Sequence, residues 1–348
     1  MKRERERERE RASFIKGIGR AAAAVALSSG LLLGAGIPAQ AKPITLRVAY
    51  TAQPDCVIAH SYEVFKQELE KRTDGKVRVI LYPNAQLGND VATAEAVAKG
   101  ALDVASCGAN NISPFTKLYY WADLPFMFRD ITDVYKVYGG PVGKELKAKM
   151  LEQTPFKVLF YADTGSFRHL MNTKHPVRTP DDVRHLKFRT TPSPVETAVV
   201  ESLGGVPTPI QHSEIYMAME QGVVEAEMQQ YMWSVGTRRY QLTKYITELP
   251  AQHALHLAVM NKDKFASYPP EIRTAIDEAA AAAEAYNFAN APRANEELRQ
   301  LVMKSGCQII TLTPEEIEPF RQRAMKVWDA YKDEVDMELV SRVQAIQQ

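Results

Sequence analysis

The spacing of hydrophobic residues over 46–106 predicts strands and helices in turn. Residues 46–50 form a short apolar run, and apolar side chains then recur at helical spacings across 58–69. Residues 77–81 alternate between apolar and polar side chains, as a second strand would. A strand, a helix and a strand in close succession predict a βαβ unit with parallel strands.

The same succession of elements repeats further along the chain. The pattern predicts a helix over 91–98, a short apolar strand over 102–106 and a further strand over 156–161. Residues 186–190 alternate like a strand, which places Arg189 on the face opposite to Phe188. Strands that alternate with helices in this way predict an α/β fold.

The C-terminal part of the chain has an almost wholly helical pattern from Glu271 onward. Thr313 and Glu316 form a capping box that opens the last predicted helix. The apolar stripe of this helix runs from Ile317 to Tyr331. We interpret these helices as packing elements.

The first 41 residues have the three parts of a secretory signal peptide. A basic stretch over 1–20 precedes an apolar run over 21–37, and Ala39 and Ala41 form a small-x-small cleavage site. A permanent membrane span fits less well, because Ser and Gly dilute the apolar run. We expect a periplasmic protein cleaved after Ala41. Residues 11–16 resemble a twin-arginine signal without its second arginine, so the export route stays open.

The charge balance argues against a nucleic-acid partner. Of the 43 Lys and Arg and the 42 Asp and Glu, eight and four lie in residues 1–41, which leaves 35 against 38 and a net charge of −3 after cleavage. Phosphate backbones are bound by a concentrated excess of Lys and Arg. No such cluster follows residue 42.

The remaining length and the cysteines limit the architecture. About 300 residues are enough for two lobes, with a cleft between them, and too many for one small core. The three cysteines, Cys56, Cys107 and Cys307, are too few and too widely spaced for a zinc cage. They are compatible with one disulfide and one thiol, or with three buried thiols.

The sequence contains no common signature of a cofactor, a metal or a hydrolase. It has no glycine-rich phosphate loop, no Gly-x-Ser-x-Gly and no His-Glu-x-x-His. His253 and His256 sit in an apolar run, from Ala254 to Val259, that predicts a strand, and their spacing of three places them on opposite faces. We therefore predict no cofactor and no metal site.

Arginine offers the clearest chemistry for ligand recognition. In open α/β sheets, ligands bind outside the carboxyl ends of the strands, and Arg189 lies near such an end. A guanidinium matches a carboxylate with two parallel hydrogen bonds and keeps its charge at physiological pH. Arg168 is a second candidate. Because most arginines are solvated or paired at the surface, this interpretation needs further context.

Six short segments provide that context through their order and spacing. They read TDGKV at 73–77, YPNAQLG at 82–88, KGALD at 99–103, LPFMF at 124–128, RTPDD leading to KFR at 178–189, and SEIYMAMEQGVV at 213–224. Each segment alone has little specificity. Together, over nearly all of residues 44–340, they resemble the substrate-binding proteins of tripartite ATP-independent periplasmic (TRAP) transporters, the DctP-type family.

The resemblance implies a fold and a role. The implied fold is an α/β, two-lobed periplasmic binding protein (type II-like) with hinge strands, a long connecting helix and a helical C-terminus. Lobe 1 would comprise 42–164 and 254–295, and lobe 2 would comprise 165–253 and 296–348. The implied role is to bind a small carboxylate-containing organic acid in the cleft and deliver it to the membrane subunits of a TRAP transporter.

The resemblance also implies which residues contact the ligand. Arg189 matches the family arginine that pairs with the ligand carboxylate, and Arg168 matches a second pocket arginine. His212 stands where relatives often place an aromatic residue against the ligand. Thr51, Cys107 and Gly108 fall at first-lobe strand ends that would face the cleft. Independently of the resemblance, Asn110 and Asn111 closely follow a strand end and could reach the cleft, although either could simply form a turn.

The chain departs from the family pattern after Val224. The family usually has Asp-Gly-x-Glu-Asn, whereas this chain reads EAEMQ at 225–229. Gln229 therefore replaces an asparagine that commonly touches the ligand. Because its amide is displaced by about one bond, we expect a ligand whose shape differs from sialic acid or a simple dicarboxylate.

Two other functions are compatible with the same cleft. A sensor module would bind a solute in the same way, and an exported enzyme could use Glu214, Glu225 or Glu227 as a base. These carboxylates are better explained as charges on a helix surface.

The aromatic residues at 119–121 are expected in the core, because each ring buries a large area.

Overall fold

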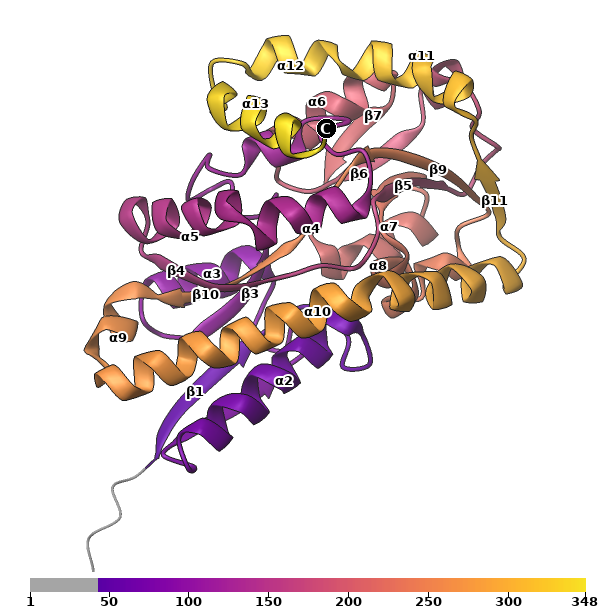
Figure 1. Cartoon of the computed structure of the whole chain (residues 1–348). Coiled ribbons are helices and arrows are strands. Elements are labelled where there is room, and N and C mark those ends of the chain that lie inside the picture. The colour runs from indigo at the N-terminus through magenta and orange to yellow at the C-terminus, as the bar shows by residue number, and fades with distance from the viewer. Residues whose placement is uncertain (1–42) are drawn as a thin grey trace, which may run out of the picture. The chain divides into compact units, whose positions relative to one another are not determined.

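The computed structural model describes residues 43–348, which form one compact unit. Residues 1–42, which include the predicted signal peptide and its cleavage site, lie outside the described residues. Within 43–348, no helix combines the length and the apolar character needed to cross a membrane. The described chain forms two β-sheets with helices packed against them (Figure 1).

The first sheet has five strands in the order β2-β1-β3-β10-β4. β1 pairs in parallel with both β2 and β3, which confirms the predicted βαβ unit. β10 lies antiparallel between β3 and β4. The strands are β1 (Ile44–Ala49), β2 (Val77–Tyr82), β3 (Val104–Gly108), β4 (Phe156–Ala162) and β10 (His256–Asn261).

β3 begins two residues later than the sequence predicts. At Asp103 the side chain, rather than the backbone, accepts the hydrogen bond of the Arg47 N–H, at 2.7 Å. The regular ladder therefore starts only at Val104, which is fully buried.

The second sheet has six strands in the order β11-β9-β5-β8-β6-β7. β6 pairs in parallel with β7 and β8, and β5 is antiparallel to both β8 and β9. The strands are β5 (Arg168–Asn172), β6 (Lys187–Thr190), β7 (Val206–Pro209), β8 (Ala226–Gln229), β9 (Tyr245–Gln252) and β11 (Gln308–Thr311).

Twelve α-helices and four short 3-10 helices complete the described chain. The helices before the long α10 are α2 (Val57–Arg72), α3 (Asp90–Ala98), α4 (Ile131–Gly139), α5 (Pro141–Gln153), α6 (Pro194–Leu203), α7 (Ile215–Glu220), α8 (Tyr231–Gly236) and α9 (Lys262–Ser267). The others are α10 (Pro270–Lys304), α11 (Pro314–Ala324), α12 (Lys326–Tyr331) and α13 (Met337–Ile346), with η1 (Tyr120–Asp123), η2 (Pro180–Val183), η3 (His212–Glu214) and η4 (Arg239–Gln241).

The C-terminal part differs from the predicted run of helices in two ways. α10 ends before Gly306, whose positive φ of 92° turns the chain so that β11 pairs with β9. The capping box of Thr313 is confirmed, but the predicted last helix is two helices, α11 and α12, and α13 follows them. α11 and α12 pack on α6, whereas α13 contacts α4 and its Arg342 pairs with Glu145 of α5 (Figure 1).

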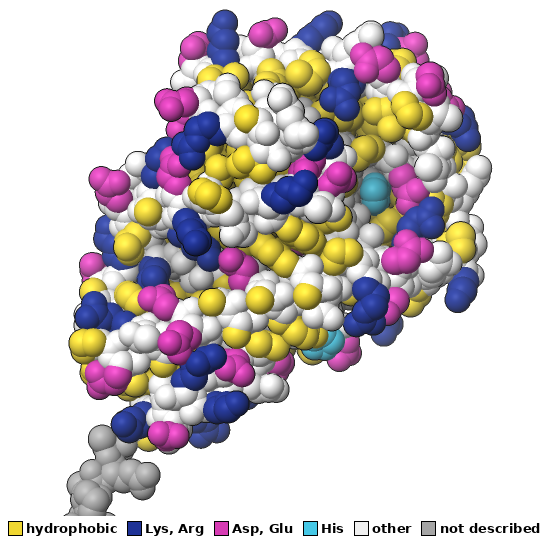
Figure 2. All heavy atoms as spheres, viewed as in Figure 1, with side chains coloured by type: hydrophobic (Ala, Val, Ile, Leu, Met, Phe, Trp, Pro, Cys, Tyr) yellow, Lys and Arg dark blue, Asp and Glu magenta, His cyan; other side chains and the backbone are white. Residues whose placement is uncertain are grey.

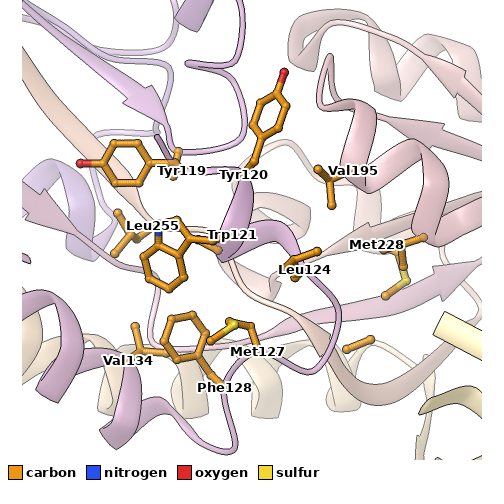
Figure 3. Close-up of a cluster of buried hydrophobic side chains, with 14 of the residues drawn as sticks. Tyr119, Tyr120, Trp121, Leu124, Met127, Phe128, Val134, Val195, Met228 and Leu255 are labelled. Carbon is orange, nitrogen blue, oxygen red and sulfur yellow. The ribbon is translucent and has the colours of Figure 1, made fainter. Parts of the chain in front are cut away.

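A large aromatic cluster lies in the core, as expected for residues 119–121 (Figure 3). Tyr119 and Trp121 are almost completely buried, and the Trp121 ring stacks on Tyr138 with centroids 5.9 Å apart. Phe128 approaches Trp121 edge-on. Tyr119, Trp121 and Phe128 lie in the segment between β3 and α4, and the contacts of Trp121 and Phe128 with Tyr138 anchor this segment on α4.

Charged side chains of both signs mix on the surface drawn in Figure 2. On this face of the described chain, Lys and Arg alternate with Asp and Glu, and no extended basic patch forms. A nucleic-acid backbone would require such a patch.

Two segments that cross between the sheets are tied together by Asp163. Asp163 follows β4, and His253 stands between β9 and β10; their side chains meet at 3.0 Å. Asn287 of α10 accepts a hydrogen bond from the Asp163 backbone at 2.6 Å. α10 runs along α2 and reaches α8 (Figure 1). The two-lobed fold has its crossing strands and long helix, while the residue boundaries of the lobes stay a prediction.

Gly165 lies in one of these crossing segments and packs directly on α10. Its φ is +83°, and an added Cβ would come within 2.1 Å of the Ala291 carbonyl oxygen. Both the backbone conformation and the contact therefore require glycine.

We predict that Gly165→Ala lowers the free energy of unfolding by about 2–4 kcal/mol, the sum of an unfavourable φ and a steric clash. Urea unfolding measures this. Gly100→Ala is the matched control, because Gly100 also has a positive φ but open space around it. Equal losses in the two variants would contradict the packing argument.

Asp123, at the end of η1, contacts residues of the second sheet and its helices. Ser193 Oγ donates to its carboxylate at 2.7 Å, and Gln252 Nε2 donates to its backbone carbonyl at 2.9 Å. Burial raises the pKa of Asp123 to about 7, and the nearby Glu196 adds to this, although Arg168, Ser193 and His253 act in the opposite direction.

A raised pKa in the folded state predicts that stability falls as the pH rises from about 4 to about 7, where only the folded state keeps the proton. Asp123→Asn removes this contribution. Relative to the wild type, the variant should therefore gain stability steadily over this interval, on the scale of about 1.4 kcal/mol per pKa unit. Urea unfolding at several pH values measures the difference, and a difference independent of pH would contradict the prediction.

Candidate functional site

A small cavity, partly open to solvent and with room for water-sized molecules over about 30 Å³, lies where the edges of the two sheets meet. Most of the side chains around it are polar, and both sheets contribute to them. The cavity is lined by Thr51, Asp90, Asn110, Asn111, Arg168, Arg189, Thr191, His212, Gln229, Gln230, Trp233, Ala254 and His256.

Strand direction explains why residues so distant in sequence meet here. Thr51 and Asn110 follow the carboxyl ends of β1 and β3, and Thr191 and Gln230 follow those of β6 and β8. Antiparallel strands bring their amino ends to the same edges, so His256 at the start of β10 lies opposite Gly108. The cavity therefore occupies the place where open α/β sheets bind ligands.

Arg189 of β6 is buried in the wall of this cavity and has no carboxylate partner. Its side chain is 3 % exposed, and its Nε donates to the Ile210 carbonyl oxygen at 3.0 Å. Within residues 43–348, no acidic group lies close enough to form an ion pair with it. Burial lowers the pKa of Arg189 to about 10, so the guanidinium is still charged at neutral pH.

Arg168, at the start of β5, is also buried but is paired. Its Nη1 lies 2.9 Å from Oε2 of Glu196, a fully buried residue of α6. Although burial alone would raise the pKa of Glu196, Arg168 and Arg189 hold it below its usual value. The carboxylate is therefore ionised, and it neutralises the charge of Arg168.

Glu196 also organises a hydrogen-bonded link between the two sheets. It accepts hydrogen bonds from both the backbone N–H and the hydroxyl of Thr191. The Thr191 hydroxyl accepts a hydrogen bond from Asn110 Nδ2 at 2.9 Å, so the wall after β3 is joined to the wall after β6. The pairing of Arg168 and the contact across the cavity thus share one carboxylate.

A third buried arginine, Arg239, lies outside the cavity wall. Its Nε donates to Glu227 Oε1 at 2.8 Å, and neither side chain is exposed. Glu227 was expected on a helix surface as a possible base; instead it is a buried residue of β8 that neutralises an arginine. Of the three buried arginines in the described chain, two have their own carboxylate and Arg189 has none.

Asp90 supplies a carboxylate on the opposite side of the cavity. It is the first residue of α3, where the helix N-terminus favours a negative charge. Its Oδ1 accepts from the Thr51 hydroxyl at 2.9 Å, and its Oδ2 accepts from the Gly108 N–H at 3.0 Å and Asn111 Nδ2 at 2.8 Å. No Lys or Arg pairs with it among the described residues.

Aromatic rings and amides form the rest of the wall. Trp233 lies between two imidazoles, with ring centroids 5.0 Å from His212 and 4.9 Å from His256. Burial lowers the pKa of both histidines, so both are neutral at pH 7. Gln230 Nε2 donates to the Ala254 carbonyl at 2.8 Å. These groups can bind polar atoms of a ligand without adding charge.

Six of the eight residues predicted from the sequence lie in the cavity wall: Arg189, Arg168, Gln229, His212, Thr51 and Asn110. Two do not. Cys107 is fully buried in the core, because alternate residues of β3 face opposite ways. Gly108 reaches the site only through its N–H, which holds Asp90. Whether the six contact a ligand stays a proposal.

Several residues of the wall were not found from the sequence, above all Asp90, Trp233 and His256. The helix start at Asn89 and Asp90 was a usable signal, because a helix that follows a strand begins at the carboxyl edge of the sheet, where ligands bind in open α/β sheets. His256 was interpreted only as a strand residue; β10 in fact begins there, and its Nδ1 contacts Ser106 Oγ at 3.1 Å.

The cysteines and histidines form neither a disulfide nor a metal cluster in the described part of the chain. All three cysteines are free, in agreement with the alternative of separate thiols, and Cys56 caps α2 through its sulfur. Within 43–348, no group of three or more His, Cys, Asp or Glu is placed to hold a metal ion.

Comparison with known proteins identifies the family. Residues 48–334 match the model of the DctP family, described as bacterial extracellular solute-binding protein, family 7. The chain is 30 % identical over 249 residues to the 2,3-diketo-L-gulonate-binding periplasmic protein of Escherichia coli, covering 71 % of this chain and 75 % of that protein. It is 28 % identical over 320 residues to the C4-dicarboxylate-binding periplasmic protein DctP of Rhodobacter capsulatus, covering 91 % and 95 %.

Solved structures agree with this assignment. A TRAP periplasmic solute-binding protein from Sulfurospirillum deleyianum, with bound succinate, superposes with a TM-score of 0.82 at 27 % identity and covers 87 % of this chain and 99 % of that one. One from Chromohalobacter salexigens, with bound D-glucuronate, gives 0.81 at 26 % identity with the same coverage. The chain belongs to the DctP family and is a two-lobed solute-binding protein of the TRAP type.

Proposed function

We propose that this protein binds a small organic acid in the cavity between the sheets, with Arg189 as the anchor of the ligand carboxylate and Arg168 as a second donor. The protein acts by binding and delivery, without catalysis. The observation that carries this proposal is the buried guanidinium of Arg189, which has no carboxylate partner in the described chain.

The physical argument starts from the cost of that charge. A buried cation without a partner is unfavourable unless another group compensates it. A carboxylate is the natural complement, because its two oxygens match the two outward N–H groups of a guanidinium. An anion bound there gains a charge-assisted contact that is stronger than in bulk water, because the site is largely shielded from solvent.

The ligands of the relatives support this class. The names of the similar proteins give 2,3-diketo-L-gulonate and C4-dicarboxylates, and the solved structures hold succinate and D-glucuronate. All of these molecules carry a carboxylate. They differ in the rest of the molecule, which is consistent with one shared anchor and a variable remainder of the cavity.

Export and delivery complete the proposed role. The signal peptide predicted over 1–41 would place the mature protein in the periplasm, where the family operates. The ligand would bind between the two sheets and favour the closed arrangement, and the closed protein would then dock on the membrane subunits of a TRAP transporter.

We predict that Arg189→Ala weakens binding by about 1.5–3 kcal/mol, roughly ten- to a hundredfold. The ligand for this test is whichever of succinate, D-erythronate, D-gluconate or D-glucuronate raises the melting temperature of the wild type most. Isothermal titration then compares wild type, Arg189→Ala and Arg189→Lys. Lysine should rescue binding only in part, because it restores the charge without the planar fork.

Arg184→Ala is the control for this series, because Arg184 is an exposed arginine of the same lobe. Its affinity should equal that of the wild type. Unchanged affinity in Arg189→Ala, or no stabilisation of the wild type by any of the four acids, would contradict the proposal.

We predict that the exported protein begins at Lys42. Expression of the full chain in a Gram-negative host, followed by N-terminal sequencing of the periplasmic fraction, measures this. A single substitution, Ala41→Arg, should block processing, because a large charged residue does not fit a small-x-small site. A periplasmic protein that still begins at Met1 would show that the segment is not a cleaved signal.

A further inference from the structure

The charged groups of the cavity restrict the class of acid that can bind more narrowly than the contact with Arg189 does alone. Three of the lining residues have acidic or strongly basic side chains: Arg168, Arg189 and Asp90. Arg168 is neutralised by Glu196 at 2.9 Å, so its positive charge is not available to a second anion. Within residues 43–348, the cavity therefore offers one arginine without an ion pair, Arg189, and one carboxylate without an ion pair, Asp90.

These two charges stand on opposite sides of the cavity. Arg189 belongs to β6 of the second sheet, whereas Asp90 opens α3 and is held by Thr51, Gly108 and Asn111 of the first-sheet side. A ligand whose carboxylate meets Arg189 therefore directs its other end toward a carboxylate. Two like charges a few ångström apart repel by about 1–4 kcal/mol, so a second ligand carboxylate is disfavoured there.

Asp90 favours a hydroxyl at that end of the ligand. A carboxylate has about four lone-pair sites, and three of those of Asp90 already accept hydrogen bonds. One remaining acceptor suits a hydroxyl, which donates once, better than an ammonium group, which donates three times. The neutral imidazole of His256 and the amide of Asn111 stand beside it and can serve neighbouring hydroxyls.

We propose that this cavity selects hydroxylated monocarboxylic acids over dicarboxylic acids, and that Glu196 and Asp90 set this selection. The inference rests on the proposed function, because it assumes that Arg189 holds the carboxylate. Glu196 is a positioning residue: it acts through Arg168 and Thr191 and does not itself line the cavity. Asp90 acts directly, by accepting from the ligand and by repelling a second negative charge.

The test uses two pairs of acids with equal carbon number, D-erythronate with succinate and D-gluconate with adipate, titrated into the mature wild-type protein. We expect the hydroxylated acid of at least one pair to bind at least tenfold more tightly than its dicarboxylic partner. A dicarboxylate that binds as tightly as the hydroxylated acid in both pairs, or no binding of either hydroxylated acid, overturns the proposal.

Two variants locate the selection. Glu196→Gln keeps the size of the side chain and its acceptor for Thr191 but frees the charge of Arg168, so the ratio of dicarboxylate to hydroxy-acid affinity should rise about tenfold. Asp90→Asn should also raise this ratio, but for another reason. It weakens binding of the hydroxy acid, whose hydroxyl loses a charged acceptor, and it removes the repulsion of a second ligand carboxylate. If neither variant that folds changes the ratio, the assignment of these residues is wrong.

Glu248→Gln is the matched control. Glu248 of β9 pairs with Arg299 of α10, and neither residue lines the cavity, so this variant also breaks an arginine pair and should leave the ratio unchanged. The two proposals fail separately. Unchanged binding in Arg189→Ala overturns the anchor, whereas lost binding in Arg189→Ala together with a wild-type preference for succinate or adipate overturns only the selection.

Discussion

The buried guanidinium of Arg189, which has no carboxylate partner within residues 43–348, is the constraint on which the site depends. Burying a charge costs desolvation free energy, which a nearby carboxylate would largely offset. A buried arginine without such a partner is therefore expected where a ligand supplies the compensating charge. β6 holds the residue rigidly: Phe188 faces the core on one side of the strand, and Arg189 faces the cavity on the other. The Ile210 carbonyl fixes Nε and leaves the outer N–H groups toward the cavity.

The surrounding pairs determine how much positive charge the cavity presents. Three arginines are buried near one another, and two of them are matched by Glu196 and Glu227. Without these carboxylates the cavity would be a general anion site. With them, the described residues of the wall include one arginine without an ion pair, Arg189, together with Asp90, neutral imidazoles and amides. Relatives that share the fold and bind different acids are consistent with an anchor whose neighbours vary.

The site also depends on how the two sheets are joined. Neither sheet alone forms the wall, and the hydrogen bond from Asn110 to Thr191 crosses from one to the other. Asp163, His253 and Asn287 tie the crossing segments to the long helix α10, and Gly165 allows them to pack closely there. A ligand that contacts Arg189 and Asp90 together favours this arrangement over any in which the sheets are further apart.

The sequence by itself determined the βαβ unit, the capping box of Thr313, and the face of the strand on which Arg189 lies. Each of these follows from side-chain period and from hydrogen bonds within a few residues. Position in the chain alone made Arg168 and Asn110 candidates, and family resemblance added His212, Thr51 and Gln229; all five lie in the cavity wall. It did not reveal that Cys107 faces the core, that Glu227 is buried, or that Asp90, Trp233 and His256 complete the wall. Only the tertiary structure decided which arginine has a carboxylate partner. Such pairing joins residues far apart in the chain, and its strength depends on burial and distance, which local patterns do not contain.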